Sequence, residues 1–224
     1  MSSITLYMGL RNLDSLLITE IFQSIQGEGR YIGIPMLFVR TNRCNLRCRW
    51  CDSTYTFQGG NEVTLQELAG RVKEYGHEWV CFTGGEPLLQ REALQFVDLA
   101  HDLGKNVLLE TGGSLSVKEM ARRDSVYIDM DIKTPSSGEE NSLLKKNLNY
   151  LREQDYIKFV ISDKNDLEYS IRFLQDNRLN VEALFQPAWG TSLQWIAEEV
   201  LGRGINARVL PQLHKIIWGE RRGV

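Results

Sequence analysis

Cysteine and histidine are scarce in this 224-residue sequence, which contains 4 and 3 of them. So few cysteines in a chain of this length disfavour a disulfide framework, on which small secreted domains depend. No uninterrupted apolar segment is long enough to span a bilayer, and residues 1–10 lack the charged and then apolar pattern of a signal peptide. The net charge is −3, so no basic surplus indicates bulk binding of nucleic acid.

The remaining composition, 42% hydrophobic and 25% charged, is that of an ordinary globular protein. No internal repeat, low-complexity run or linker divides the sequence, so a single domain over residues 1–224 is expected. Residues 1–13 carry no pattern and are interpreted as an arm, either mobile or in contact with a second subunit. Because three of the four cysteines are clustered, a reducing, cytoplasmic location is expected, without membrane attachment.

The clustered cysteines are Cys44, Cys48 and Cys51, in a C-x3-C-x2-C spacing with an aromatic residue just before the last. A four-iron cluster held by protein alone needs four thiolates, so three would leave one iron open to another ligand. A structural zinc site is the alternative, although zinc usually takes four ligands arranged as two spaced pairs. The fourth cysteine, Cys81, and the histidines form no second pair.

Apolar, β-branched runs alternate with segments of helical pattern along most of the chain. The expected strands are 16–22, 36–40, 79–83, 106–110, 126–132, 156–161, 181–185 and 208–210. The expected helices are 64–75, which begins with the capping box Thr64/Glu67, and then 91–103, 141–151, 166–176 and 192–201. Such alternation predicts an α/β fold with parallel strands and right-handed crossovers. Because a complete eight-fold barrel takes about 250 residues, we expect an open, truncated, partial (β/α)6 barrel.

In folds of this kind the functional residues lie at the carboxyl ends of the strands. Five predicted strands end in glycine or polar residues, which either form ordinary turns or face a common cavity. These ends are Thr83-Gly84-Gly85-Glu86-Pro87, Glu110-Thr111-Gly112-Gly113-Ser114, 131–138, Ser162-Asp163 and Gln186-Pro187. Glycines let the backbone approach a ligand closely, and we favour the common cavity.

The cysteine spacing and the Gly84-Gly85-Glu86 sequence together resemble the signature of radical S-adenosylmethionine (SAM) enzymes. A narrower likeness, over roughly residues 18–220, is to the 7-carboxy-7-deazaguanine synthase family. It is carried by six stretches: 24–29 (SIQGEG), 38–40 (FVR), 51–53 (CDS), 83–87 (TGGEP), 131–133 (DIK) and 213–215 (LHK).

This resemblance implies ring contraction of 6-carboxy-5,6,7,8-tetrahydropterin to 7-carboxy-7-deazaguanine with loss of ammonia, a step towards queuosine and related deazapurines. It implies a [4Fe-4S] cluster, SAM acting as a regenerated cofactor, and Mg²⁺. It also implies a flavodoxin- or ferredoxin-type reductant and a homodimer.

The resemblance also implies residue roles. Cys44, Cys48 and Cys51 would bind the cluster. The residues implied for SAM are Trp50, Cys51, Asp52, Gly85, Glu86, Lys133 and Gln186. The residues implied for the pterin are Ile25, Gln26, Gly27, Glu28, Arg40 and Thr83, with Arg40 on its carboxylate.

The implied Mg²⁺ ligand is the hydroxyl two residues after the last cysteine, which is Ser53 here, although the family often has threonine and Thr54 follows. The tail 218–224 would fold over the site and present its terminal carboxylate. His214 is interpreted as structural, and Trp189, Trp195 and Trp218 as core or interface. Rival interpretations are an activase that installs a glycyl radical, which leaves residues 26–29 and Arg40 unexplained, and a zinc-stabilised binding module.

Overall fold

The computed structural model describes residues 14–224, so the interpretation of residues 1–13 as an arm lies outside the described part. Within it, nine strands form one sheet in the order β3-β1-β2-β4-β5-β6-β7-β8-β9. They are β1 (Ser15–Ile25), β2 (Pro35–Thr41), β3 (Asn61–Thr64), β4 (Trp79–Gly84), β5 (Asn106–Thr111), β6 (Val126–Asp131), β7 (Tyr156–Ile161), β8 (Glu182–Pro187) and β9 (Arg208–Val209). Strand β1 runs antiparallel to both β2 and β3, whereas every pair from β2 to β9 is parallel.

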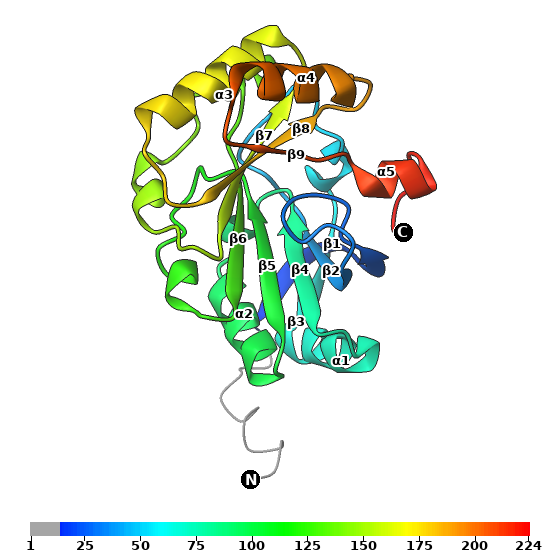
Figure 1. The fold of residues 1–224 in the computed structure, drawn as a ribbon. Coiled ribbons are helices and arrows are strands. Elements are labelled where there is room, and N and C mark those ends of the chain that lie inside the picture. The colour runs from blue at the N-terminus through cyan, green and yellow to red at the C-terminus, as the bar shows by residue number, and fades with distance from the viewer. Residues whose placement is uncertain (1–13) are drawn as a thin grey trace.

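Five α-helices accompany the sheet in the described residues. They are α1 (Leu65–Tyr75), α2 (Ala93–Asp102), α3 (Lys164–Asp176), α4 (Leu193–Arg203) and α5 (Leu213–Trp218). The first four cover one face of the curved sheet, while α5 lies beyond β9 beside the C-terminus (Figure 1). The sheet does not close, because β3 and β9 form its two edges. The prediction of an open α/β partial barrel is therefore confirmed.

Alternation along each parallel strand separates an outer face from an inner face. In β4, Val80 and Phe82 belong to the large core beneath the helices, whereas Cys81 belongs to a second, inner core. The same parity in the neighbouring strands places Leu108 and Tyr156 in the inner core. The outer residues thus hold the helices, and the inner residues fill the concave side of the sheet.

The inner face has two layers along the strand direction. The layer towards the strands' amino ends is apolar and aromatic, with Tyr31 packed against Trp79, Tyr127 and Tyr156. Two residues further along each strand, the inner positions become polar or charged. This polar layer consists of Arg40, Thr83, Glu110, Asp129, Lys158 and Gln186. Because alternate residues of each strand face inwards, the polar layer lies directly above the apolar layer.

Most predicted elements agree with the structure within two or three residues, including the capping box at Thr64 and Glu67. The predicted helix 141–151 is wrong, because only a 3-10 turn at Lys145–Asn149 forms there. Asn147 is fully buried, and its side chain bonds to the backbone of Gly113, Leu115 and Val117. These bonds attach the segment to the loop after β5.

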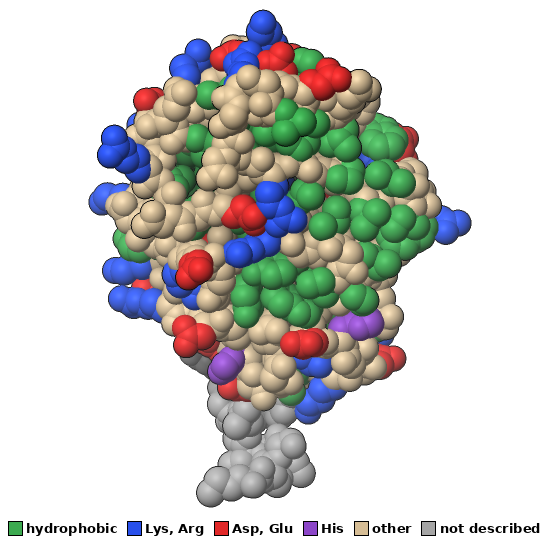
Figure 2. Space-filling model, in the orientation of Figure 1, with side chains coloured by type: hydrophobic (Ala, Val, Ile, Leu, Met, Phe, Trp, Pro, Cys, Tyr) green, Lys and Arg blue, Asp and Glu red, His purple; other side chains and the backbone are tan. Residues whose placement is uncertain are grey.

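Two elements were missed, the short edge strand β3 and the helix α5. No helix in residues 14–224 is long and apolar enough to cross a membrane. Figure 2 shows hydrophobic side chains gathered on the right half of the face seen in Figure 1, where α5 lies. Ile216 and Ile217 of α5 are among the exposed hydrophobic residues.

Candidate functional site

A cavity of about 600 Å³ lies at the carboxyl ends of the parallel strands. Its wall contains nearly all the residues that the family resemblance implied for cluster, SAM, pterin and Mg²⁺. They are Ile25, Gln26, Gly27, Glu28, Arg40, Cys44, Cys48, Trp50, Cys51, Asp52, Ser53, Thr83, Gly85, Glu86 and Lys133. The exception is Gln186, which is 1% exposed and does not reach the cavity surface. Its side-chain nitrogen and oxygen are buried without a hydrogen-bond partner among the described residues.

Not every strand end contributes to the cavity as expected. The ends of β4, β5 and β6 do, but Ser162 and Asp163 after β7 do not line it. Asp163 instead caps α3 by accepting a hydrogen bond from the amide of Asp166. After β8 the wall is formed by Ala188 and Trp189 rather than by Gln186 and Pro187.

The cysteine loop follows β2 and holds three free, half-buried thiols on the same cavity wall. Burial raises the pKa of each of these thiols, that of Cys48 to about 11. The loop itself is ordered by backbone bonds, with the amide of Cys51 donating to the carbonyl of Cys48 at 3.2 Å. The amide of Leu46 lies 3.4 Å from the sulfur of Cys44. The fourth cysteine, Cys81, is buried in the inner core and is not on the wall.

Glycines after β4 bring the strand end against the cysteine loop. The amide of Glu86 donates to the carbonyl of Arg43 at 2.8 Å, and that of Gly85 to the carbonyl of Thr41 at 3.2 Å. A Cβ atom on Gly85 would collide with the carbonyl of Arg43, so only glycine allows this approach. The Glu86 carboxylate accepts from Thr111 and from the amides of Leu88 and Gly112.

Lys133 follows the end of β6 and lines the same cavity as Glu86. Its ammonium is 3.0 Å from Asp131 and 5.4 Å from the Trp50 ring. Burial alone would lower the pKa of Lys133, but Asp131 raises it above its ordinary value, so the group is charged. Trp50 is fixed by its indole N–H, which donates to Ser136 at 2.9 Å.

Arg40 at the end of β2 already has a carboxylate partner. Its Nε is 2.7 Å from Glu20, which also accepts from the Tyr55 hydroxyl at 2.9 Å. Burial alone would lower the pKa of Arg40, but Tyr55 and Glu20 raise it. Within residues 14–224 no hydrogen bond engages the two terminal nitrogens of Arg40, which leaves them available to an anionic ligand.

Glu110 at the end of β5 orients two residues implied for the pterin. One carboxylate oxygen accepts from the side-chain Nε2 of Gln26 at 2.9 Å, and the other from the hydroxyl of Thr83 at 2.6 Å. The side-chain Oε1 of Gln26 accepts from the backbone N–H of Glu28 at 3.1 Å. Since Thr83 donates its only proton to Glu110, its oxygen faces other groups only as an acceptor.

Lys158 of β7 is the buried cation at the cavity floor. Its Nζ lies 2.8 Å from Glu28 and 3.2 Å from Asp129. Burial alone would raise the pKa of Glu28, but Lys158 lowers it far below its ordinary value. Gln212 donates to the other oxygen of Glu28 at 2.9 Å. Asp129 differs, because burial raises its pKa to about 7 despite the attraction of Lys158.

The raised pKa of Asp129 predicts a dependence of stability on pH. Between its ordinary pKa of 3.8 and about 7, the unfolded chain loses the proton while the folded chain keeps it. The free energy of unfolding contributed by this group is therefore fully present below pH 4 and is lost as pH rises to 7, with a slope of up to about 1.4 kcal/mol per pH unit. Urea unfolding of wild type and Asp129→Asn from pH 4 to 7 measures it. The free energy of unfolding of wild type relative to Asp129→Asn should fall as pH rises from 4 to 7. A constant difference between the two proteins would contradict this prediction.

Several cavity residues were not assigned a role from the sequence. They are Glu20, Tyr55, Glu110, Asp129, Lys158 and Gln212, and His214, interpreted from the sequence as structural, also lines the cavity. The available signal was strand parity, since Asp129 and Lys158 share the parity of apolar residues that face inwards. The tail also lines the cavity from Gly219 to Val224, and Arg222 lies 4.2 Å from the Tyr55 ring centroid. His214 approaches Gly27 so closely that a Cβ there would collide with its ring.

The thiols fit a cubane cluster better than a single ion. Within residues 14–224, no three His, Cys, Asp or Glu side chains are grouped so that they could hold one metal ion. A four-iron cluster is bound by one thiolate per iron, so its ligands need not converge on one point. The three cysteines on one wall could supply three such ligands, whereas Cys81 lies in the inner core and does not line the cavity.

Comparison with known proteins agrees with this geometry. Residues 38–160 match the model of the Radical SAM superfamily. The 7-carboxy-7-deazaguanine synthase of Thermoplasma acidophilum is 55% identical over 93% of this chain and 100% of its own length. That of Koribacter versatilis is 40% identical over 92% of this chain and 99% of its own. The crystal structure of QueE from Escherichia coli covers 89% of this chain and 95% of its own, with a TM-score of 0.75 and 23% identity.

The fold and the cysteine site together define a radical SAM enzyme, a class that uses a [4Fe-4S] cluster and SAM. Within that class, the chain belongs to the 7-carboxy-7-deazaguanine synthase family of lyases.

Proposed function

We propose that this protein contracts the ring of 6-carboxy-5,6,7,8-tetrahydropterin to give 7-carboxy-7-deazaguanine with loss of ammonia. The observation that carries the proposal is a single cavity with three thiols on one wall and a charged inner layer on its floor. High identity over the full length of the Thermoplasma relative supports the same reaction. When bound, the cluster and SAM supply the radical that starts this chemistry.

Cys44, Cys48 and Cys51 are the proposed cluster ligands, because they are the thiols on the cavity wall. SAM would lie beside them, against the backbone of Gly85 and the side chains of Trp50, Asp52, Glu86 and Lys133. The lysine's charge, held by Asp131, suits an anionic group of the cofactor. Gln186 does not line the cavity, so it is not proposed as a SAM contact.

The pterin would occupy the opposite part of the cavity, over the charged layer. Residues 25–28 line this part of the cavity, and the ionised carboxylate of Glu28 suits the guanidine-like edge of the ring. Thr83 would accept a hydrogen bond from the substrate, because its hydroxyl already donates to Glu110. Arg40 would bind the substrate carboxylate with the two nitrogens that Glu20 leaves unused.

Mg²⁺ is proposed to bind at Ser53 rather than at Thr54. Ser53 lines the cavity and its hydroxyl lies 2.9 Å from Asp52, whereas Thr54 is exposed in the turn that follows. Hydroxyl and carboxylate oxygens suit this hard cation, which stabilises developing negative charge on a substrate. A flavodoxin- or ferredoxin-type reductant and a homodimeric assembly complete the proposal.

Anaerobic turnover tests the proposed function. Reconstituted protein, SAM, a reductant and carboxytetrahydropterin should give the deazaguanine chromophore and free ammonia, at a higher rate with Mg²⁺ than without. A Ser53→Ala variant should lose most of the Mg²⁺ stimulation, while Thr54→Ala keeps it. SAM cleavage without any deazaguanine would contradict the proposed substrate.

Substitution of Arg40 with alanine should weaken binding of the carboxypterin. A buried guanidinium–carboxylate pair is worth on the order of 2–5 kcal/mol when one partner is removed. Calorimetric titration of the Arg40→Ala protein measures the loss, with Glu20→Gln as the matched control. The control keeps the guanidinium of Arg40 but removes the charge of its partner Glu20. The affinity of this variant for the carboxypterin should therefore fall less than that of Arg40→Ala. Unchanged affinity in Arg40→Ala would remove this residue from the substrate site.

A further inference from the structure

The carboxylate of Glu28 has acceptor sites that the protein leaves unfilled. An ionised carboxylate only accepts hydrogen bonds, and it has about four lone-pair sites, shared equally between its oxygens. The Nζ of Lys158 occupies one site on Oε2 at 2.8 Å, and the side-chain Nε2 of Gln212 occupies one on Oε1 at 2.9 Å. Among residues 14–224 no other group donates to this carboxylate. Because Glu28 lines the cavity, one site on each oxygen remains for a ligand.

Glu28 also fixes the orientation of the Gln212 amide. Since the carboxylate can only accept, the amide nitrogen must face it, and the amide oxygen lies on the other arm of the group. That oxygen, Oε1, is buried and has no hydrogen-bond partner among the described residues, although Gln212 lines the cavity. Leaving a buried polar oxygen unpaired costs free energy, so a ligand that donates to it would bind more tightly.

Backbone contacts hold Gln212 beside Glu28. Gln212 directly precedes α5, and the amide of Leu213 donates to the carbonyl of Gly27 at 2.8 Å. The ring of His214 packs so closely on Gly27 that a Cβ atom there would collide with it. The neighbours of Gln212 are therefore bonded to the neighbour of Glu28, which fixes the two side chains relative to one another.

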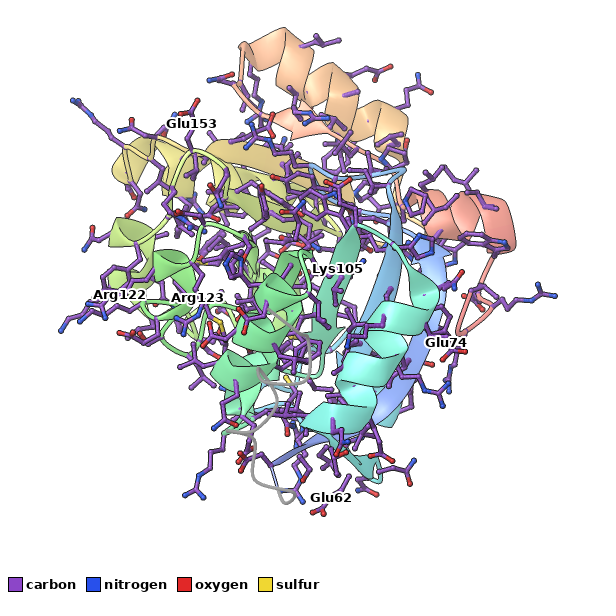
Figure 3. All side chains as sticks on the ribbon, turned by 90° about the horizontal axis from the view of Figure 1, so that it is seen from below. Glu62, Glu74, Lys105, Arg122, Arg123 and Glu153 are labelled. Atoms are coloured by element: carbon purple, nitrogen blue, oxygen red, sulfur yellow. The ribbon has the colours of Figure 1, made fainter. Side chains whose placement is uncertain are left out.

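Other carboxylates of the chain lack this arrangement. In the view from below, Glu62, Glu74 and Glu153 project from the outside of the molecule (Figure 3), and all three are exposed. Exposed carboxylates form their hydrogen bonds with water, so a ligand gains little by replacing that water. The side chain of Glu28 is only 19% exposed, and its protein partners have fixed positions. A ligand at Glu28 must therefore match the sites that those partners leave.

We propose that Gln212 is a specificity-determining residue, which together with Glu28 requires an exocyclic 2-amino group on the substrate ring. This rests on the proposed function, because it concerns how that substrate is recognised. A 2-amino-4-oxopyrimidine ring presents a ring N–H and one amino N–H side by side, and the second amino N–H beyond them. The first two match the unfilled sites of Glu28, and the last matches the unpaired Oε1 of Gln212.

The same geometry predicts which analogues are rejected. A 2-oxo ring would place its oxygen against the acceptor oxygens of Glu28 and Gln212, so like partial charges would face each other. A 2-deamino ring would leave Oε1 of Gln212 and one site of Glu28 unpaired. Both analogues should bind more weakly than the 2-amino ring, and the 2-oxo analogue should bind most weakly.

Calorimetric titration of three ligands tests the proposal. They are carboxytetrahydropterin, its 2-deamino analogue and its 2-oxo analogue, added to reconstituted protein with SAM but without reductant, so that no turnover starts. Wild type should bind the 2-deamino analogue at least about tenfold, and the 2-oxo analogue at least about a hundredfold, more weakly than carboxytetrahydropterin.

The variant Gln212→Met keeps the size of the side chain but removes both of its polar atoms. Any effect that acts only through Glu28 should weaken both 2-amino and 2-deamino ligands equally, so the ratio of the two affinities isolates the contact with the amino group. Gln212→Met should therefore lose about tenfold more affinity for carboxytetrahydropterin than for the 2-deamino analogue. Gln194→Met, at an exposed glutamine of α4, is the matched control and should behave as wild type.

Equal loss of both ligands in Gln212→Met would overturn the proposal, because Gln212 would then serve only to position Glu28. The shorter Gln212→Asn should show the same change in preference, and an unchanged preference in that variant would also contradict the role of Oε1. A wild-type protein that binds the 2-oxo analogue as tightly as carboxytetrahydropterin would refute the proposal without any variant. The proposed function fails separately, if wild type shows this preference but makes no deazaguanine once reductant is added.

Discussion

Cys48→Ala protein is expected to fold normally but to remain colourless after anaerobic reconstitution with iron and sulfide. Cys48 lies in an irregular loop and its side chain is half-buried, so removing the sulfur creates little cavity. Two thiolates would remain for four irons, too few to hold the cluster. The brown absorbance and SAM cleavage should both disappear, while the circular dichroism spectrum matches wild type.

The matched control is the fourth cysteine. Cys81 is fully buried in the inner core, so Cys81→Ala should keep its iron content while losing some stability. A brown Cys48→Ala protein, or a colourless Cys81→Ala protein that is still folded, would show that the cluster ligands have been misassigned.

Lys158→Met is expected to cost the largest amount of stability of any single change in the cavity floor. The variant leaves Glu28 and Asp129 buried without their shared cation, and breaking a buried ion pair from one side costs about 3–5 kcal/mol. Urea unfolding at pH 7 measures this loss. Lys145→Met, at an exposed lysine, should stay within about 0.5 kcal/mol of wild type.

The cost should also depend on pH in a defined direction. Without Lys158, burial raises the pKa of both carboxyl groups in the folded state, so both take up protons more readily there. Stability then falls as pH rises, and the penalty should be greatest near pH 7 and smaller near pH 4. The double variant Lys158→Met/Asp129→Asn should recover part of the loss. A penalty below about 1 kcal/mol at pH 7 would show that Lys158 does not hold these groups.

The sequence predicts the parts of this fold that depend on local pattern. The capping box of α1 and the apolar strands each have a short-range cause, and the structure has them within a few residues. The prediction of a helix over residues 141–151 failed because the side chain of the buried Asn147 donates its hydrogen bonds to a distant loop. Edge strand β3 is only four residues long and is defined by pairing with β1, which a local pattern does not reveal.

The site residues that belong to short motifs could likewise be predicted from the sequence, whereas those brought together by distant contacts could not. Motif and resemblance found the cysteine loop and the glycines after β4, where the chemistry depends on a few neighbouring residues. Lys158 was missed because Tyr156–Ile161 reads as a simple apolar strand, and one lysine in it resembles a solvent-facing position. Its partners are far away in the chain: the sheet register brings Asp129 of β6 to it, and the turn after β1 brings Glu28.

The most direct measurement is electron paramagnetic resonance of the anaerobically reduced, reconstituted protein before and after SAM is added. In the proposed site three thiolates would leave one iron open to SAM, so the spectrum of the reduced cluster should shift when SAM is added. A Cys81→Ala sample should shift in the same way. A spectrum that SAM leaves unchanged, or a reconstituted protein that contains only one tetrahedral, colourless metal ion, would contradict the three-cysteine site.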